Sequence, residues 1–274
     1  MSNSATPTVK SPVKHKASGL PTTIASEWTK IWSLRTTRIL LLVAVGLAAL
    51  AAALFVLTSA VTTGTGIADR DVFDVVSTSL LGSDAAALTL MVMAATTIGS
   101  EYSTGMIRVT LTASPKRSQF LAAKTVVIAV VTYVVGLVAA FVAYGVGQLI
   151  LLSQGLDIAS LADPRILRLI AGSALMAPLY GLIAVAFGIV FRSTAGGIVS
   201  ALVALVIPSI VGWLGEAGNG IMAYLPGEAL HNVAGLTPAT APYAIGTGVS
   251  AIVLVAWVLL VLVIAQSLLA KRDA

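Results

Sequence analysis

The chain contains no cysteine and few charged residues. Of its 274 residues, 16 are lysine or arginine and 11 are aspartate or glutamate, so only 10% carry a charge, whereas soluble domains have about 25%. The lack of cysteine excludes disulfides, thiol catalysis and thiolate metal sites. Apolar residues make up 58% of the chain, which is too much for one water-soluble core and for a disordered chain. The composition therefore favours a protein embedded in a membrane.

Six apolar stretches are long enough to cross a membrane as helices. The first, residues 39–60, has 22 uncharged residues, which span roughly 33 Å at about 1.5 Å per residue, enough for a hydrocarbon layer about 30 Å thick. Ser83 is a candidate N-cap for the second stretch, and residues 192–195 separate the fourth and fifth stretches as a tight hairpin. The remaining stretches are residues 83–100, 126–152, 166–191, 196–214 and 245–270. We therefore predict an all-α, polytopic membrane protein with six transmembrane helices.

Basic residues gather on one side of this predicted topology. With both termini in the cytoplasm, 13 basic residues lie inside and only Arg70, Arg165 and Arg168 lie outside. Three acidic residues lie inside and eight outside, so the formal charge is +10 inside and −5 outside. Cytoplasmic loops of membrane proteins carry such an excess of lysine and arginine. We predict a multi-pass protein of the plasma membrane, the cytoplasmic membrane of a bacterium, that contacts membrane lipid and no nucleic acid.

Two segments precede the first apolar stretch. Residues 1–23 are rich in serine, threonine, proline and lysine, which predicts a disordered basic cytoplasmic tail. In residues 24–38, Ile24, Trp28 and Ile31 fall at helical spacing. This pattern predicts an amphipathic helix in the membrane interface, where tryptophan rings suit the headgroup layer. The alternative is that residues 24–38 simply extend the first transmembrane helix. At the other end, residues 271–274 form a short cytoplasmic C-terminus.

The predicted cytoplasmic loop, residues 101–125, follows the second stretch. Met106, Val109 and Thr110 share one face of a short helix at helical spacing. Such a helix, placed at the end of a transmembrane helix, could transmit a push from a partner protein. Taken alone, these residues also fit an ordinary loop with basic anchors.

Two motifs in this loop resemble a known family. The sequence Glu101-Tyr-Ser-Thr-Gly-Met-Ile-Arg108, followed by Leu111-Thr-Ala-Ser-Pro-Lys-Arg117, resembles the permease subunits of ABC-2 type ABC transporters. That family typically has Glu-Tyr-x-x-Gly-Thr-[Ile/Leu]-Arg and then Ser-Pro-Arg-Arg. Met106 replaces the usual threonine, which puts a hydroxyl-specific role there in doubt, and Lys116 replaces an arginine. The resemblance extends to the interfacial helix, the six spans and the outer segment before the last span.

The resemblance implies a coupling helix that docks on a separate ATP-hydrolysing subunit. The residues to which it assigns this contact are Glu101, Tyr102, Gly105, Met106, Ile107 and Arg108. It also implies a connector helix along the inner leaflet that contacts the same ATPase. The connector residues are Trp28, Trp32 and Arg35.

The predicted outer segment, residues 213–244, has no basic residue. Residues 221–226 and 227–233 are predicted to form two short helices that dip back into the bilayer. In the family that the chain resembles, such a hairpin lines the outer gate. The resemblance assigns this role to Tyr224, Pro226 and Glu228. His231 stands alone in the segment, so no metal site is expected.

The function that the resemblance implies is the transmembrane half of an ATP-driven exporter. Two halves, identical or related, would assemble with two ATPase subunits and move an apolar or amphipathic substrate, such as a drug, a peptide, a lipid or a polysaccharide. The chain has no Gly-x-x-x-x-Gly-Lys-Ser/Thr loop, so we expect no enzyme activity and no bound cofactor, with ATP and magnesium held by the partner.

Three alternatives remain open from the sequence. A secondary carrier independent of ATP would need a charged or broken-helix site within the membrane. An intramembrane protease is suggested only by Ser173 and His231, without the Gly-x-Ser-x-Gly turn of one serine hydrolase class. The third alternative is a receptor or a membrane anchor that transports nothing, and only the two motifs argue against it.

Overall fold

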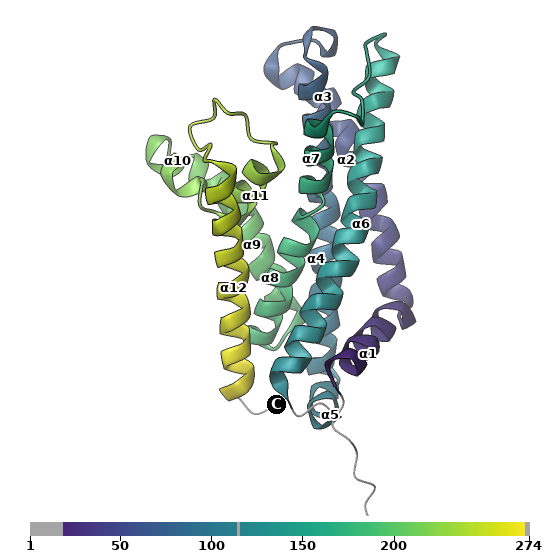
Figure 1. The fold of residues 1–274 in the computed structure, drawn as a ribbon, viewed down its shortest axis with the longest axis vertical. Coiled ribbons are helices and arrows are strands. Elements are labelled where there is room, and N and C mark those ends of the chain that lie inside the picture. The colour runs from purple at the N-terminus through teal and green to yellow at the C-terminus, as the bar shows by residue number, and fades with distance from the viewer. Residues whose placement is uncertain (1–18, 114–115, 272–274) are drawn as a thin grey trace, which may run out of the picture.

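The computed structural model describes residues 19–113 and 116–271, and most of these residues are helical (Figure 1). The elements are α1 (Leu20–Ser33), α2 (Arg35–Thr63), the 3-10 helix η1 (Ile67–Asp69), α3 (Val72–Leu80), α4 (Gly82–Ser103), α5 (Met106–Ala113), α6 (Arg117–Ser153), α7 (Pro164–Ser173), α8 (Met176–Phe191), α9 (Thr194–Gly212), α10 (Glu216–Met222), α11 (Pro226–Ala234) and α12 (Thr247–Lys271). The described residues contain no β-strand. The predicted all-α fold is confirmed.

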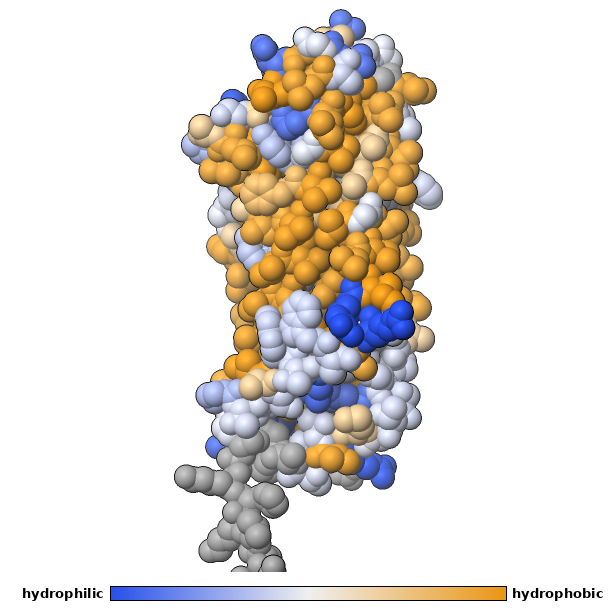
Figure 2. All heavy atoms as spheres, turned by 90° about the vertical axis from the view of Figure 1, so that its right-hand side faces the viewer, coloured by the Kyte–Doolittle hydropathy of each residue, from blue (hydrophilic) through white to orange (hydrophobic). Residues whose placement is uncertain are grey.

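Six helical segments within the described ranges are long and apolar enough to cross a membrane. They are Arg35–Ser59, Val72–Ser103, Arg117–Ser153, Pro164–Phe191, Thr194–Gly212 and Thr247–Lys271. These segments run roughly along the long axis of an elongated molecule, with α1 and α5 at one end and α3, α10 and α11 toward the other (Figure 1). On the face shown in Figure 2, hydrophobic residues cover most of the length and polar residues gather toward the α1 and α5 end. The architecture is that of a polytopic membrane protein.

The N-terminal helix differs from its predicted bounds. Helix α1 begins at Leu20, inside the predicted tail, with a proline in its first turn, where a missing N–H is harmless. It ends at Ser33 because Leu34 is extended, with φ −88° and ψ 122°. Arg35 is therefore the first residue of α2 and not part of the predicted connector helix. Of the predicted termini, residues 1–18 and 272–274 lie outside the described residues.

The second and third spans begin earlier than predicted. Leu81, with helical φ −60° and ψ −19°, is the N-cap of α4, so α3 leads almost directly into α4. Ser83 is consequently inside the helix, 3% exposed, and the prediction that it caps the helix is wrong. Helix α6 starts at Arg117 and carries Lys124 within it. A buried lysine is tolerated there because it has carboxylate partners, described below.

The fourth and fifth spans are joined by the predicted tight hairpin. Helix α8 ends at Phe191, and Arg192 takes a left-handed conformation with φ +53°. The side chain of Ser193 then accepts a hydrogen bond from the Gly196 amide and caps α9. This N-cap lets the chain reverse direction within three residues.

The packing of the bundle is uneven. Helix α8 is buried among its neighbours, whereas the apolar stretches of α9 and α12 are only 17% buried within the chain. Helices α4 and α9 approach so closely at Gly99 that an added Cβ would lie 2.5 Å from the backbone of Thr194. The exposed sides of α9 and α12 are therefore available to lipid or to another protein.

Candidate functional site

Four charged side chains meet at the end of the molecule that holds α1 and α5. We call Glu27, Lys30, Glu101 and Lys124 the charge cluster. Lys124 Nζ lies 2.6 Å from Glu27 Oε2 and 3.0 Å from Glu101 Oε1. Lys30 Nζ lies 2.5 Å from Glu27 Oε1 and 2.9 Å from Glu101 Oε1. Helix α1 supplies two of these residues and α4 and α6 one each, so the charge cluster ties three helices together.

The charge cluster is almost completely shielded from solvent. The Lys124 side chain is 2% exposed and each carboxylate side chain is 5% exposed, whereas Lys30 is 30% exposed. Removing a charge from water costs several kcal/mol, so charges stay in such a place only when they are paired and hydrogen-bonded. Two positive and two negative groups satisfy this condition. The cluster is therefore neutral as a unit.

The pKa values of the α1 residues reflect this pairing. Burial raises the pKa of Glu27, but the charge and hydrogen bonds of Lys124 and Lys30 outweigh it and hold that pKa below its ordinary value. Burial lowers the pKa of Lys30, but the Glu27 hydrogen bond and the Glu101 charge outweigh it and raise that pKa. Both residues are consequently charged at neutral pH.

Helix α1 places the cluster by its periodicity. Its buried residues, Thr23, Glu27 and Ile31, are four apart and form one stripe. Trp28 and Trp32 point away from that stripe, are 44% and 43% exposed, and have ring centroids 5.8 Å apart. The buried stripe is centred on Glu27, so Ile31 faces the bundle whereas Trp28 does not.

Three residues of the predicted coupling motif face inward. Glu101 belongs to the charge cluster, Ile107 is 3% exposed in the core, and Tyr102 is half-buried against that core. These three side chains fix the junction of α4 and α5 to the bundle. They do not form a free docking surface.

The rest of the motif forms a turn and an exposed helix. Gly105 has φ +71°, a left-handed conformation that glycine adopts without strain, and it separates α4 from α5. The predicted short helix is present as α5. Met106 and Val109 are 48% and 66% exposed, Arg108 is exposed, and Thr110 is half-buried. The outward face of α5 is therefore an apolar patch with one arginine beside it.

At the opposite end, the predicted outer residues lie around two short helices. Helix α11 corresponds to the second predicted helix, but α10 covers residues 216–222, so the predicted helix over 221–226 is wrong. Leu225 precedes a proline and is extended, which ends helical structure before α11. Tyr224 is 53% exposed in the intervening turn, and its carbonyl accepts a hydrogen bond from Trp257. Pro226 is buried at the start of α11.

His231 has two carboxylate neighbours. Its Nε2 lies 3.5 Å from Asp84 Oδ2 on α4, and its Nδ1 lies 3.9 Å from Glu228 Oε1 on α11. Burial lowers the pKa of His231, but Asp84 and Glu228 outweigh it and raise the pKa to about 10. The histidine that stands alone in the sequence thus lies between a carboxylate of α4 and one of α11, with which it forms ion pairs when it is protonated. Within the described ranges, no three His, Asp or Glu residues are arranged to hold a metal ion.

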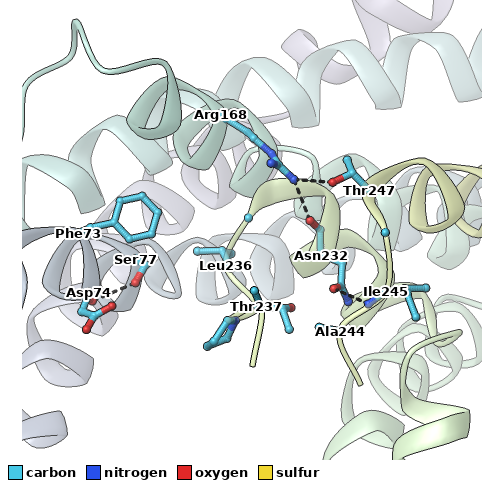
Figure 3. A pocket seen from close by; sticks show the side chains of 14 residues that line it. Phe73, Asp74, Ser77, Arg168, Asn232, Leu236, Thr237, Ala244, Ile245 and Thr247 are labelled. Atoms are coloured by element: carbon cyan, nitrogen blue, oxygen red, sulfur yellow. Dashed lines mark hydrogen bonds between the residues drawn. The ribbon is translucent and has the colours of Figure 1, made fainter. Parts of the chain in front are cut away.

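Arg168 fastens another part of this end (Figure 3). Its guanidinium donates to the carbonyls of Val233 and Asn232 and to the hydroxyl of Thr247. It thereby holds the start of α12 and the end of α11 against α7. A pocket of about 550 Å³ lies beside it, with Phe73 and other α3 residues on the far side. Arg168 therefore acts as a structural bridge here.

Sequence reasoning missed the charge cluster as a unit. Glu27 and Glu101 are two of only three acidic residues predicted on the basic inner side. Their presence among so many basic residues could have indicated that they form ion pairs. In the sequence, Lys124 lies just before the predicted third span, residues 126–152. Its 97-residue separation from Glu27 gives no local pattern.

The fold defines a polytopic, all-helical membrane architecture. Residues 41–274 match the model of a family described as "Protein of unknown function (DUF2705)", and the chain belongs to that family. A search of curated proteins finds no match. The matched region includes Glu101 and Lys124 and begins after the two charge-cluster residues of α1.

Proposed function

We propose that this chain is the transmembrane permease subunit of an ATP-driven ABC-2 type exporter, which moves an apolar or amphipathic substrate out across the plasma membrane. The observation that carries the proposal is the short helix α5, which is exposed on one side and attached to the transmembrane bundle on the other. It contains the central part of the motif that resembles the family. Drugs, peptides, lipids and polysaccharides all remain candidate substrates.

The attachment of α5 suits a helix that transmits force. Gly105 is the only residue between Thr104, the C-cap of α4, and the start of α5. Ile107 anchors α5 in the core, and Glu101 ties the end of α4 to α1 and α6 through the charge cluster. A displacement of α5 would therefore move three helices together. An ATPase that changes shape on binding ATP could drive this displacement.

The proposed contact surface for the ATPase consists of the side chains that α5 and α1 leave exposed. Met106, Arg108 and Val109 on α5 would contact the ATPase, with Trp28 and Trp32 of α1 at the membrane surface beside them. Basic residues at this end, including Lys30 and Arg108, support its orientation toward the cytoplasm. ATP and magnesium would be held by the ATPase, and this chain would bind no cofactor of its own.

Two further features support the assembly. The sparsely buried sides of α9 and α12 offer surface for lipid and for a second permease half, identical or related. Helices α10 and α11 would form the outer gate, with Tyr224 exposed in the turn between them. The His231 link to α4 would hold that gate against the bundle.

The test uses one substitution on α5 and a matched control. Val109→Asp places a charge on the exposed patch of α5. The control, Val61→Asp, places the same charge at an 83% exposed position near the C-terminal end of α2. The tagged chain is purified from its native membranes and the accompanying ATP hydrolysis is measured. We expect at least a tenfold loss of ATPase activity for V109D and none for V61D, with equal membrane insertion. Equal activity for the two variants, or none with the wild-type chain, would contradict the proposal.

A secondary carrier is the alternative, and one observation favours it. The Asp84, His231 and Glu228 group supplies ionisable side chains near a transmembrane helix, which the sequence did not reveal. The two functions differ in their energy source. Transport that survives ATP depletion while the ion gradient is intact would support the carrier and exclude the ATP-driven exporter.

A further inference from the structure

The pocket of about 550 Å³ beside Arg168 has one charge of each sign on its walls (Figure 3). Its volume is within the range of small-molecule sites, about 300–1,000 Å³. Among the described residues that line it, Arg168 and Asp74 are the two that carry a charge. Asp74 and Ser77 lie on the α3 side, whereas Arg168 and Thr247 lie on the other (Figure 3). The pocket is therefore bordered by a positive group and a negative group.

The Asp74 carboxylate is free for a ligand. The side-chain donors that reach this residue use its backbone carbonyl, which accepts from Arg70 Nη2, Ser77 Oγ and Thr78 Oγ1. Within the described ranges, the carboxylate itself makes no hydrogen bond and no ion pair, and Asp74 is exposed. A cation that bound to this carboxylate would therefore displace no contact of the protein.

Arg168 keeps donors for a further partner. Its Nε and Nη2 donate to the carbonyls of Val233 and Asn232 and to the hydroxyl of Thr247. A guanidinium has five N–H donors, and Nη1 has no hydrogen-bond partner among the described residues. Arg168 is exposed and lines the pocket. Because three hydrogen bonds already fix the guanidinium, its remaining donors are held in place for an anionic group such as a phosphate.

The pocket lies at the level of the lipid headgroups. Its residues include members of the first two turns of the candidate spans that begin at Val72, Pro164 and Thr247. The last of these spans has 25 residues, which extend over about 37 Å at about 1.5 Å per residue. This length exceeds the hydrocarbon layer, about 30 Å, but not the whole bilayer with its headgroups, about 40–45 Å. The start of α12, and the pocket beside it, therefore belong to the headgroup layer.

We propose that this pocket binds the zwitterionic headgroup of phosphatidylethanolamine, with the phosphate at Arg168 and the ammonium group at Asp74. A phosphate alone would be attracted by Arg168 but repelled by Asp74, and an ammonium ion alone would meet the reverse. A headgroup with both charges matches both walls. The apolar lining residues Phe73, Leu236 and Ile245 suit the start of the acyl chains.

The site goes beyond the proposed function and does not depend on it, because lipid binding requires neither an ATPase nor transport. Free phosphoethanolamine has the same two charges. The lipid is favoured as the source because it is concentrated at the level of the pocket.

The test uses the full chain in micelles of a neutral detergent. The probe is phosphatidylethanolamine with a photoreactive diazirine in one acyl chain, close to the glycerol, and mass spectrometry locates the labelled residues. We expect label on Phe73, Leu236 or Ile245. Label elsewhere on the chain, with none in the pocket, would overturn the proposal.

Competition identifies the ligand. Unlabelled phosphatidylethanolamine should displace the label in the pocket at a concentration about fivefold lower than phosphatidylglycerol, whose headgroup lacks the ammonium group. This factor is the contribution of one accessible ion pair. Equal competition by the two lipids would overturn the proposal. Free O-phosphoethanolamine should compete at least tenfold more weakly than the lipid because it has no acyl chains. Competition as strong as that of the lipid would overturn the lipid as the occupant.

Two aspartates give a matched pair of variants. Asp74 and Asp69 are both exposed at this end of the chain, but only Asp74 lines the pocket. Asp74→Asn leaves the backbone contacts in place and removes the negative wall, so phosphatidylglycerol should now compete at least as well as phosphatidylethanolamine. Asp69→Asn should keep the wild-type preference. The same preference in both variants would overturn the proposal.

Arg168→Gln tests the phosphate contact. Glutamine can still donate to a carbonyl of α11 but carries no positive charge. We expect labelling of the pocket to fall about fivefold and phosphatidylglycerol to compete no longer. Unchanged labelling would overturn the assignment of Arg168. If this variant does not fold, the Asp74 and Asp69 pair decides the proposal alone.

Discussion

Replacing Lys124 by methionine tests how strongly the charge cluster holds α1 against the bundle. The change removes one ammonium group but keeps the length and the apolar part of the side chain. It leaves Glu27 and Glu101, each with a 5% exposed side chain, sharing Lys30 alone. Breaking a buried ion pair by removing one partner costs about 3–5 kcal/mol. Lys30→Met is the control, because Lys30 is 30% exposed and water can replace it, so we expect about 1 kcal/mol.

Thermal unfolding of the purified chain measures the difference. Each kcal/mol shifts Tm by roughly 2–4 °C in chains of this size range, so K124M should lower Tm by about 6–20 °C and K30M by about 2–4 °C. Trp28 and Trp32 lie on α1, so their fluorescence reports its release. The double variant K124M/E101Q restores the charge balance and should be more stable than K124M alone. Equal Tm losses for K124M and K30M would refute the reasoning.

Two further predictions concern other contacts. His231→Gln should weaken the packing of α11 against α4. The pKa of His231 is about 10 in the folded chain and 6.5 in the unfolded chain. The stabilisation by His231 is therefore complete below about pH 6.5 and is lost as the pH rises through about 10. Thermal unfolding at a series of pH values should show the gap between wild type and H231Q closing above pH 10, and a constant gap would oppose the ionic link. Gly99→Ala should cost about 1–3 kcal/mol or more because its Cβ would lie 2.5 Å from the backbone of Thr194, whereas Gly46→Ala, with nothing within 4 Å, should cost nothing. Equal stability of the two alanine variants would contradict the close approach of α4 and α9.

The sequence was sufficient for the features that depend on local patterns. Long apolar runs predicted the six spans, and residues at helical spacing predicted the short helix that became α5. The hairpin at Arg192 followed from the cost of a charge inside one long helix. These predictions succeeded because membrane insertion and helix formation depend mainly on neighbouring residues.

The charge cluster and the His231 link depend on contacts between distant residues. Glu27 and Lys124 are 97 positions apart, and Asp84 and His231 lie on different helices, so no periodicity connects them. The same limitation affected the spans themselves. A lysine at position 124 lies just before the apolar run 126–152 in the sequence, yet α6 begins seven residues earlier, at Arg117, and includes it, because two carboxylates from other helices surround it. Only the packed structure shows which charges neutralise each other.

The charge cluster also has a consequence for the order of events during synthesis. Glu27 and Lys30 can pair as soon as α1 forms, because they are three residues apart. Glu101 is made next and brings the local charge to −1, and Lys124 follows 23 residues later. A surplus negative charge cannot be buried cheaply. On the proposed topology, we therefore expect α1 to dock against the bundle only after the first turns of α6, the third of the six spans, have been made.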